Sequence, residues 1–217
     1  MKIINFDKGT SLVSQYMSEL RDVNIQNDRL RFRRNLERIG QIMAFEISRT
    51  LEYKEVDVQT PLGVSKCHRI ADPVVLATIF RAGVPFHLGF LEFFDNAENA
   101  FVSAYRKYKE KETFDVCIEY LASPNIEDKI VVIADPMLAT GASMELSYRA
   151  LLTKGNPRHI HVASVIASQR AIDYISETFP KDKTTIWVGA VDEHINDHSY
   201  IVPGLGDAGD LAYGVKE

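Results

Sequence analysis

One segment, residues 129–143, limits the fold of this 217-residue chain more than any other. It begins with an apolar run from Ile130 to Ala134 that lacks polar alternation and is rich in β-branched residues. Such a run is typical of a central parallel strand covered on both faces. Asp135 follows the run, and the apolar spacing from Ser143 to about Thr153 predicts a helix. We therefore expect a strand, a loop and a helix of an open α/β sheet, with the loop at the carboxyl edge where such sheets bind ligands.

The loop between this strand and helix has the residues of a phosphate site. Gly141 permits backbone conformations closed to other residues, so successive N–H groups can converge on an anion. The hydroxyls of Thr140 and Ser143 and the start of the helix also attract negative charge. No lysine follows the glycine, as a nucleoside triphosphate loop would require, so we expect another phosphate ester. Asp135 can accept hydrogen bonds from two sugar hydroxyls, which favours a ribose 5-phosphate. The alternative is that Asp135 merely caps a turn.

A second candidate binding site lies at residues 200–210. Three glycines and a proline stand there among side chains of the buried type, which predicts an ordered loop. Its main-chain N–H and C=O groups would match the donors and acceptors of a flat heterocycle, and the glycines allow close approach. The alternative is a C-terminal turn packed for stability.

Strand and helix patterns alternate along the chain, which predicts its fold class. We expect helices over about 27–52, 85–94, 143–153 and 170–179, a strand or hairpin through 56–60 that ends at 61–63, and strands over about 74–80, 100–105, 114–121, 130–134, 159–167 and 184–190. They predict an α/β fold with a doubly wound, mostly parallel sheet flanked by helices. The charged segment after Tyr105 and the strand at 114–121 should form a β-hairpin arm. The length favours one domain over 1–217, with a helical N-terminal segment (about 1–54), a core (about 70–190) and a C-terminal loop or hood (about 191–217).

Four segments together resemble the uracil phosphoribosyltransferases, a family of type I phosphoribosyltransferases. Residues 135–143 resemble that family's phosphoribosyl pyrophosphate (PRPP) motif, in which proline takes the second acidic position of the purine enzymes. Residues 200–210 resemble its uracil loop, 79–83 its Arg-Ala-Gly loop and 105–113 its flexible flap. The order and spacing agree, and a looser similarity around 31–53 extends the resemblance over nearly the whole chain.

The resemblance implies a pentosyltransferase that moves the 5-phosphoribosyl group of PRPP to N1 of uracil, giving UMP and pyrophosphate in pyrimidine salvage. It implies Mg²⁺ as cofactor, carried by PRPP, with Asp135 as its candidate protein contact. The implied catalytic residues are Arg81, Arg106 and Asp207. The implied PRPP-binding residues are Arg81, Arg106, Asp135, Pro136, Met137, Leu138, Ala139, Thr140, Gly141, Ala142, Ser143 and Asp207. Uracil would be held by Ile201, Gly206, Asp207 and Ala208.

Negative charge develops on the leaving group during such a transfer, and this charge suggests a role for Arg81 and Arg106. Pyrophosphate leaves with negative charge, which the forked donors of Arg81 and Arg106 can neutralise. Residues 105–113 would act as a lid that excludes water. Whether Asp207 removes a proton from uracil stays open. By position alone, Arg81 also fits an exposed salt bridge at a strand end, and Arg106 fits a solvated turn.

Four residues depart from the family pattern. Phe80 stands where leucine is usual, Ser199 replaces a glycine, and Leu211 takes a position that is often basic. Ala142 replaces the second glycine of the phosphate loop, and its β-carbon would weaken phosphate binding if the loop needs a positive φ there.

Composition excludes several other classes of protein. The net charge of −5 argues against general nucleic-acid binding, so the arginines from Arg29 to Arg38 are expected on a solvated or subunit-facing side of an amphipathic helix. No apolar run approaches the ~18 residues that span a bilayer, and the first residues lack a secretory signal. The two cysteines, far apart in sequence, predict reduced thiols and no metal site. We expect packing or surface roles for the histidines and a cytoplasmic location.

Two rival functions stay open at this stage. One is an RNA-binding or regulatory protein that keeps the fold and uses the arginine-rich helix. The other is a phosphoribosyltransferase for another base, such as a purine. The hairpin arm and the apolar helix suggest self-association, and the resemblance implies a homodimer or multiples of one. Activation by GTP is open.

Overall fold

The apolar run after Lys129 forms the central strand of the structure, which is a computed structural model. The structure describes residues 1–108 and 114–216. Within these ranges it describes all side chains except those of residues 104–108 and 114–117. This strand, β7 (Ile130–Ala134), is buried along its whole length. It pairs in parallel with β4 (Val74–Phe80) on one side and with β9 (His159–Ser168) on the other. The predicted bounds of β4 and β7 are confirmed, because continuous apolar runs mark strands covered on both faces.

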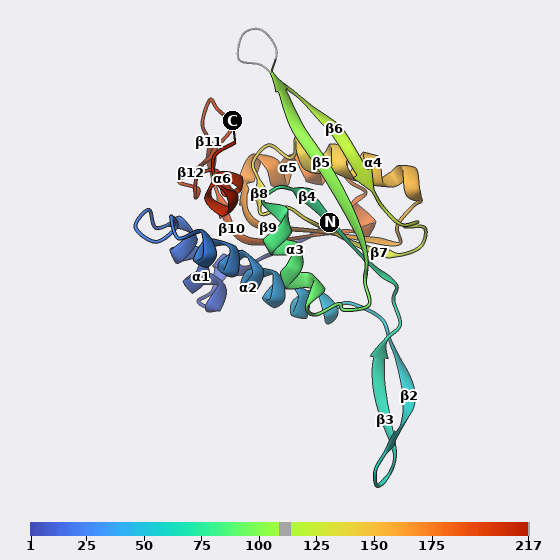
Figure 1. Ribbon diagram of the computed structural model, residues 1–217. Helices are drawn as coiled ribbons and strands as arrows, with labels where there is room; N and C mark the ends of the chain where they lie inside the picture. The colour runs from blue at the N-terminus through green and yellow to red at the C-terminus, as the bar shows by residue number, and fades with distance from the viewer. Residues whose placement is uncertain (109–113, 217) are drawn as a thin grey trace.

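The main sheet has the order β1-β10-β9-β7-β4-β5-β6 (Figure 1). Strands β1 (Lys2–Asn5) and β10 (Thr184–Asp192) extend it in parallel beyond β9, while the two-residue β8 (Met137–Leu138) also pairs with β9. On the other side β5 (Glu98–Tyr108) runs parallel to β4, and β6 (Phe114–Ala122) closes the edge antiparallel to β5. The predicted doubly wound, mostly parallel sheet is confirmed.

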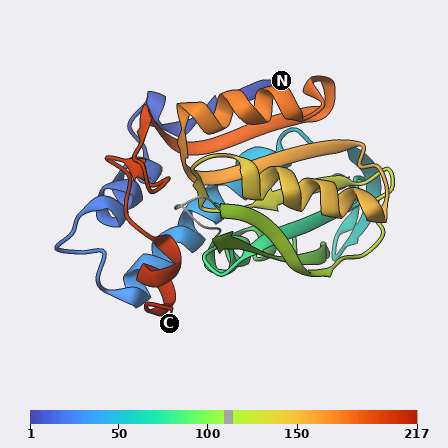
Figure 2. The same ribbon diagram turned by 90° about the horizontal axis from the view of Figure 1, so that it is seen from above.

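Helices cover both faces of this sheet (Figures 1 and 2). Ile130, Val132 and Ala134 of β7 face a core shared with α1 (Leu12–Arg21), α2 (Arg29–Ser48) and α3 (Gly83–Leu91). The alternate residues Val131 and Ile133 face a second core with α4 (Ala142–Leu151) and α5 (Gln169–Thr178). Short 3₁₀ turns, η1 (Phe6–Lys8), η2 (Leu152–Lys154) and η3 (Lys181–Lys183), complete the connections.

The projecting arm is a different hairpin from the one expected. Strands β2 (Tyr53–Thr60) and β3 (Gly63–Ile70) pair antiparallel as a separate two-stranded sheet that extends away from the body (Figure 1). Of the strand or hairpin expected at 56–63, the hairpin alternative is confirmed, and it belongs to this arm. Strands β5 and β6 do form a hairpin, but they belong to the main sheet because β5 also pairs with β4. The arm expected there is thus an edge of that sheet.

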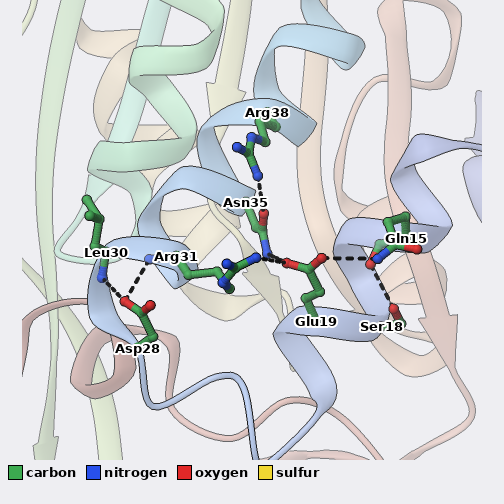
Figure 3. Close-up of polar contacts among 8 residues, drawn as sticks. All are labelled: Gln15, Ser18, Glu19, Asp28, Leu30, Arg31, Asn35 and Arg38. Atoms are coloured by element: carbon green, nitrogen blue, oxygen red, sulfur yellow. Dashed lines mark hydrogen bonds and ion pairs between the residues drawn. The ribbon is translucent and has the colours of Figure 1, made fainter.

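The arginine-rich helix α2 is amphipathic, as predicted. Phe32, Leu36 and Ile39 are buried on one side of it. On the other, Arg31 pairs with Glu19 of α1 at 3.2 Å, as Figure 3 shows. Three further arginines of α2 also contact residues of the chain: Arg34 contacts Glu37, Arg38 contacts Asn35, and Arg33 contacts the carbonyl of Ala212. Because these arginines make contacts within the chain, no specific observation on the described residues favours the RNA-binding role considered for this helix. No helix among the described residues has the length and apolar character to cross a membrane.

Candidate active site

The parallel strands bring the predicted site residues to one edge of the sheet. Arg81 follows β4, Asp135 follows β7, and Asp192 ends β10. Because the carboxyl ends of parallel strands open at the same edge, the loops after these strands share one side of the molecule. The C-terminal segment, with β11 (His194–Ile195), β12 (Ile201–Val202) and α6 (Ala208–Tyr213), also leaves from that edge, directly after β10.

The phosphate loop has the predicted strand, loop and helix geometry. Gly141 has a φ of 85°, and a β-carbon there would lie 2.7 Å from the ring of Tyr174, so this position requires glycine. Ser168 anchors the loop through a 2.6 Å hydrogen bond from its hydroxyl to the carbonyl of Ala139. A small pocket at the start of α4 is lined by Asp135, Met137, Leu138, Ala139, Thr140, Gly141, Ser143 and Met144. Of the motif residues, Pro136 and Ala142 are not among these lining residues.

The conformation of Ala142 corrects one expectation. Ala142 is the first residue of α4, and the positive φ of the loop falls on Gly141 alone. A β-carbon is therefore compatible with the backbone at position 142. The departure that does occupy a left-handed conformation is Ser199, with a φ of 63°. The glycine that is usual in the family at that place is explained by this backbone angle.

Asp135 is a carboxylate that lacks a positive partner among the described residues. Burial raises its pKa to about 7, partly opposed by the hydrogen bond that the amide of Met137 donates to Oδ1 at 3.3 Å. A buried carboxylate is stabilised by donors or by a cation. Sugar hydroxyls or a substrate-borne Mg²⁺ ion would each supply what Asp135 lacks, so the residue fits both. No cluster of three metal-ligating side chains occurs in the described part of the chain.

Arg81 joins the loop after β4 to the C-terminal segment. Its Nη2 pairs with Oδ1 of Asp210 at 2.7 Å, and its Nη1 donates to the carbonyl of Gly214 at 3.3 Å. Asp207 and Arg81 both lie close to Gly209. A β-carbon on Gly209 would be 3.2 Å from Nη2 of Arg81 and 3.2 Å from Oδ1 of Asp207. The exposed salt bridge expected from the position of Arg81 is present. The acidic partner of Arg81 in it is Asp210, which belongs to the segment 200–210, called the base loop from here on. Asp210 was not among the predicted site residues, although it lies within the segment singled out at 200–210.

The loop at 200–210 is ordered, as predicted. Ile201 and Ala208 are buried, Gly206 is exposed, and the carboxylate of Asp207 caps α6 by accepting from the amide of Asp210 at 3.0 Å. Within this loop, β12 pairs antiparallel with β11. The structure therefore brings Arg81 beside Asp207 and Asp210.

Two predicted features fall partly outside the described residues. Arg106 lies on β5, where its backbone is opposite Val116, but its side chain is not described. Of the proposed lid at 105–113, residues 109–113 lie outside the described part of the chain. The roles assigned to Arg106 and to the lid stay predictions.

His161, which is buried, and His159, which is half-buried, have structural partners. Nδ1 of His161 accepts from the indole N–H of Trp187 at 3.0 Å, and burial, with a smaller effect of His159, lowers the pKa of His161 to about 3. His159 contacts the hydroxyl of Thr185 at 3.0 Å. His194 and His198 are exposed. This arrangement agrees with the packing and surface roles expected for them.

Fold and phosphate loop together define a type I phosphoribosyltransferase. In line with this, a hypoxanthine phosphoribosyltransferase from Staphylococcus aureus superposes with a TM-score of 0.51 over 75% of this chain and 76% of that chain, at 15% identity, a likeness of fold alone. A solved structure of a protein from Aquifex aeolicus superposes with a TM-score of 0.86 over 98% of each chain, at 32% identity.

Sequence comparison identifies the family within this class. A family model described as uracil phosphoribosyltransferase matches residues 8–215. A uracil phosphoribosyltransferase from Porphyromonas gingivalis is 62% identical over 216 residues, which cover 100% of both chains. Another, from Methanothermobacter thermautotrophicus, is 42% identical over 84% of this chain and 83% of its own. The chain belongs to the uracil phosphoribosyltransferase family.

Proposed function

We propose that this protein transfers the 5-phosphoribosyl group of PRPP to N1 of uracil and releases UMP and pyrophosphate. The observation that carries the proposal is the contact of Arg81 with the base loop, at the sheet edge that also holds the phosphate loop. One site can then grip the sugar phosphate and the pyrimidine together. The name of the family and of its members agrees with this activity.

Different residues are proposed to bind the 5′-phosphate, the ribose and the pyrophosphate of PRPP. The main-chain amides of 139–143 and the start of α4 would hold the 5′-phosphate, while Asp135 accepts from the ribose hydroxyls. Arg81, with Arg106, would neutralise the leaving pyrophosphate. When bound, Mg²⁺ would supply Lewis-acid stabilisation of the pyrophosphate, with PRPP and water as most of its ligands and Asp135 as the nearest candidate carboxylate.

Main-chain groups of the base loop give the specificity for uracil. Donors and acceptors at Ile201, Gly206 and Ala208 would complete hydrogen bonds with uracil that cytosine leaves unpaired, which excludes cytosine. Asp207 would lie beside the reacting sugar. Asparagine can keep the cap that Asp207 gives α6, so Asp207→Asn should lower turnover more than PRPP binding by removing the charge beside the sugar.

A direct assay tests the proposed function. Labelled uracil, PRPP and Mg²⁺ are incubated with the protein, in parallel with cytosine, hypoxanthine and orotate. Labelled UMP from uracil alone is the expected product. Conversion of hypoxanthine or orotate in place of uracil would contradict the assignment.

Four further properties form part of the proposal. We propose a homodimer or a multiple of dimers, since the arm carries fully exposed Leu62 and largely exposed Val64, while Phe45 of α2 and Phe93 near the end of α3 are half exposed. The single-domain organisation and the cytoplasmic location also stay proposals. GTP is a candidate activator, tested by measuring KM and kcat with and without it.

The helical position of Ala142 leads to a specific prediction. Ala142→Gly should leave KM for PRPP within about twofold, since the phosphate loop does not use a positive φ at this position. The same change should lower stability by roughly 0.5–1 kcal/mol, because glycine weakens a helix relative to alanine. Steady-state kinetics and thermal melting give the two values. A clear fall in KM would show that the β-carbon does impede the phosphate.

Packing beneath the Arg-Ala-Gly loop leads to another prediction. A β-carbon on Gly83 would lie 2.3 Å from the buried hydroxyl oxygen of Thr78 and 3.2 Å from the carbonyl of Ala134. Gly83→Ala should therefore destabilise the protein by about 1–3 kcal/mol through overpacking. Adding Thr78→Ala removes the nearest atom and should restore more than half of the loss. Urea unfolding of both single variants and the double variant measures the coupling, and strict additivity would refute the contact.

A further inference from the structure

A partly buried ion pair holds the backbone of the base loop at one residue, Gly204. Asp192, the last residue of β10, accepts from the amide of Gly204 through Oδ2 at 2.8 Å. Arg21, the last residue of α1, donates to the carbonyl of the same glycine at 3.0 Å. Arg21 and Asp192 are joined to each other by two hydrogen bonds of 2.8 Å. Both polar groups of Gly204 are thus fixed by one forked pair.

A neighbouring contact holds the next residue of the loop. The side-chain amide of Gln26, in the turn after α1, donates to the carbonyl of Leu205 at 3.3 Å and to that of Leu20 at 2.8 Å. In Figure 2 the C-terminal segment passes beside the N-terminal helices, in agreement with these contacts. The N-terminal helix and its following turn therefore support the base loop across more than 170 residues of sequence.

Gly204 is the point at which the loop folds back on itself. Its φ is 60°, and a β-carbon there would lie 2.0 Å from the carbonyl oxygen of Ile201. The backbone at Gly204 therefore packs closely against Ile201, and Gly206 follows only two residues later. Ile201 and Gly206 are two of the proposed main-chain contacts of uracil. Hydrogen bonds of this kind depend on distances of about 2.7–3.2 Å, so small displacements weaken them.

The electrostatics of the pair suit a fixed support. The side chain of Asp192 is 8% exposed, and that of Arg21 is 25% exposed. Burial would raise the pKa of Asp192, but the hydrogen bonds from Arg21 and from Gly204 outweigh it and hold that pKa below its usual range. The carboxylate stays charged at neutral pH. Removal of Arg21 would leave this carboxylate buried without its partner and free to pull away from the loop.

We propose that Arg21 and Asp192, assisted by Gln26, are positioning residues that set the uracil-binding backbone of the base loop. The proposal rests on the proposed function. Neither Arg21 nor Asp192 is expected to touch uracil or PRPP; they act through Gly204. Their loss should consequently impair the binding of uracil while the phosphate loop, on another strand, keeps its affinity for PRPP.

Steady-state kinetics of matched variants test this role. Arg21→Met and Asp192→Asn should raise KM for uracil about tenfold or more and leave KM for PRPP within about twofold, because a main-chain contact to a charged group is lost. Arg21→Lys should recover part of the loss, since it keeps the charge but not the fork. Gln26→Met, the mildest change, should raise KM for uracil about threefold by removing one neutral hydrogen bond.

Arg31→Met provides the matched control. It breaks the ion pair of α2 with Glu19 of α1 (Figure 3), close to the same helix but without contact to the base loop. KM for uracil should stay within about twofold of the wild type in this variant. Thermal melting of every variant, with PRPP binding measured at equilibrium, reports whether it is folded.

The outcomes separate this proposal from the proposed function. If the wild type makes no UMP, the proposed function fails and the positioning role fails with it. If the wild type is active but both KM values rise together, or KM for uracil is unchanged in Arg21→Met, Asp192→Asn and Gln26→Met, only the positioning role is overturned. If Arg21→Met does not fold, Arg21→Lys and Gln26→Met decide by the same comparison.

Discussion

Arg81→Lys should lower kcat by about 10²-fold while the protein stays folded. The forked guanidinium can donate two hydrogen bonds to a leaving pyrophosphate, and removal of one such transition-state donor typically costs roughly 10²–10³ in kcat. Lysine keeps the positive charge but not the fork. Steady-state kinetics and single-turnover formation of UMP would measure the loss.

The ion pair between Arg81 and Asp210 supplies a control for this experiment. Asp210→Asn weakens the 2.7 Å contact but keeps the guanidinium. Since the pair is partly exposed, its loss should change stability by less than about 1 kcal/mol. If Asp210→Asn lowered kcat as much as Arg81→Lys, the arginine would act only by holding the base loop, and its catalytic role would be refuted.

Asp135→Asn should weaken PRPP binding by roughly 10- to 100-fold and at the same time stabilise the free protein at alkaline pH. The first effect is the loss of charge-assisted hydrogen bonds to the ribose hydroxyls, worth about 1.5–3 kcal/mol. The second follows from burial, which raises the pKa of Asp135 to about 7 from 3.8. The ionised carboxylate of Asp135 thus favours PRPP binding but lowers the stability of the free protein.

The sign of the pH effect is fixed by proton binding. Between pH 4 and 7 the folded protein binds a proton at Asp135 that the unfolded chain has released, so the stability of the wild type falls as pH rises across this range. The contribution is on the order of 4 kcal/mol in total. The difference in Tm between Asp135→Asn and the wild type should grow from pH 5 to pH 8.

An exposed aspartate supplies the comparison for that measurement. Asp182→Asn changes an exposed carboxylate on the surface turn η3, and its Tm is measured over the same pH range. If the difference in Tm between Asp135→Asn and the wild type varied with pH no more than that of Asp182→Asn, Asp135 would not be perturbed by burial. Calorimetric binding of PRPP would then be the remaining test of its role.

The parts of the fold that the sequence predicts best are those in which one physical signal dominates. The continuous apolar run of β7 marks a strand buried on both faces, and its bounds were predicted correctly. Helix α1 lies in the N-terminal segment expected to be helical, but its bounds were not predicted, although Val13, Met17 and Leu20 have helical spacing and Ser11 caps the helix. Strand β3 gave little signal because nearly all of its residues are exposed.

Site residues were predictable where a local motif holds them. The phosphate loop and the base loop were found from glycine placement and flanking patterns. The Arg21 and Asp192 pair was not, because these residues are 171 positions apart and only the folded chain brings them together. For Ala142 the opposite holds: its replacement of a glycine was visible in the sequence, but its helical conformation was not.

A crystal structure with UMP bound would test the central claim most directly. We predict the 5′-phosphate on the amides of 139–143, the ribose hydroxyls on Asp135, and the uracil ring against the main chain of Ile201 and of 206–208. One product molecule would then touch both loops. UMP held by one loop alone, with its base directed away from the other, would contradict the account.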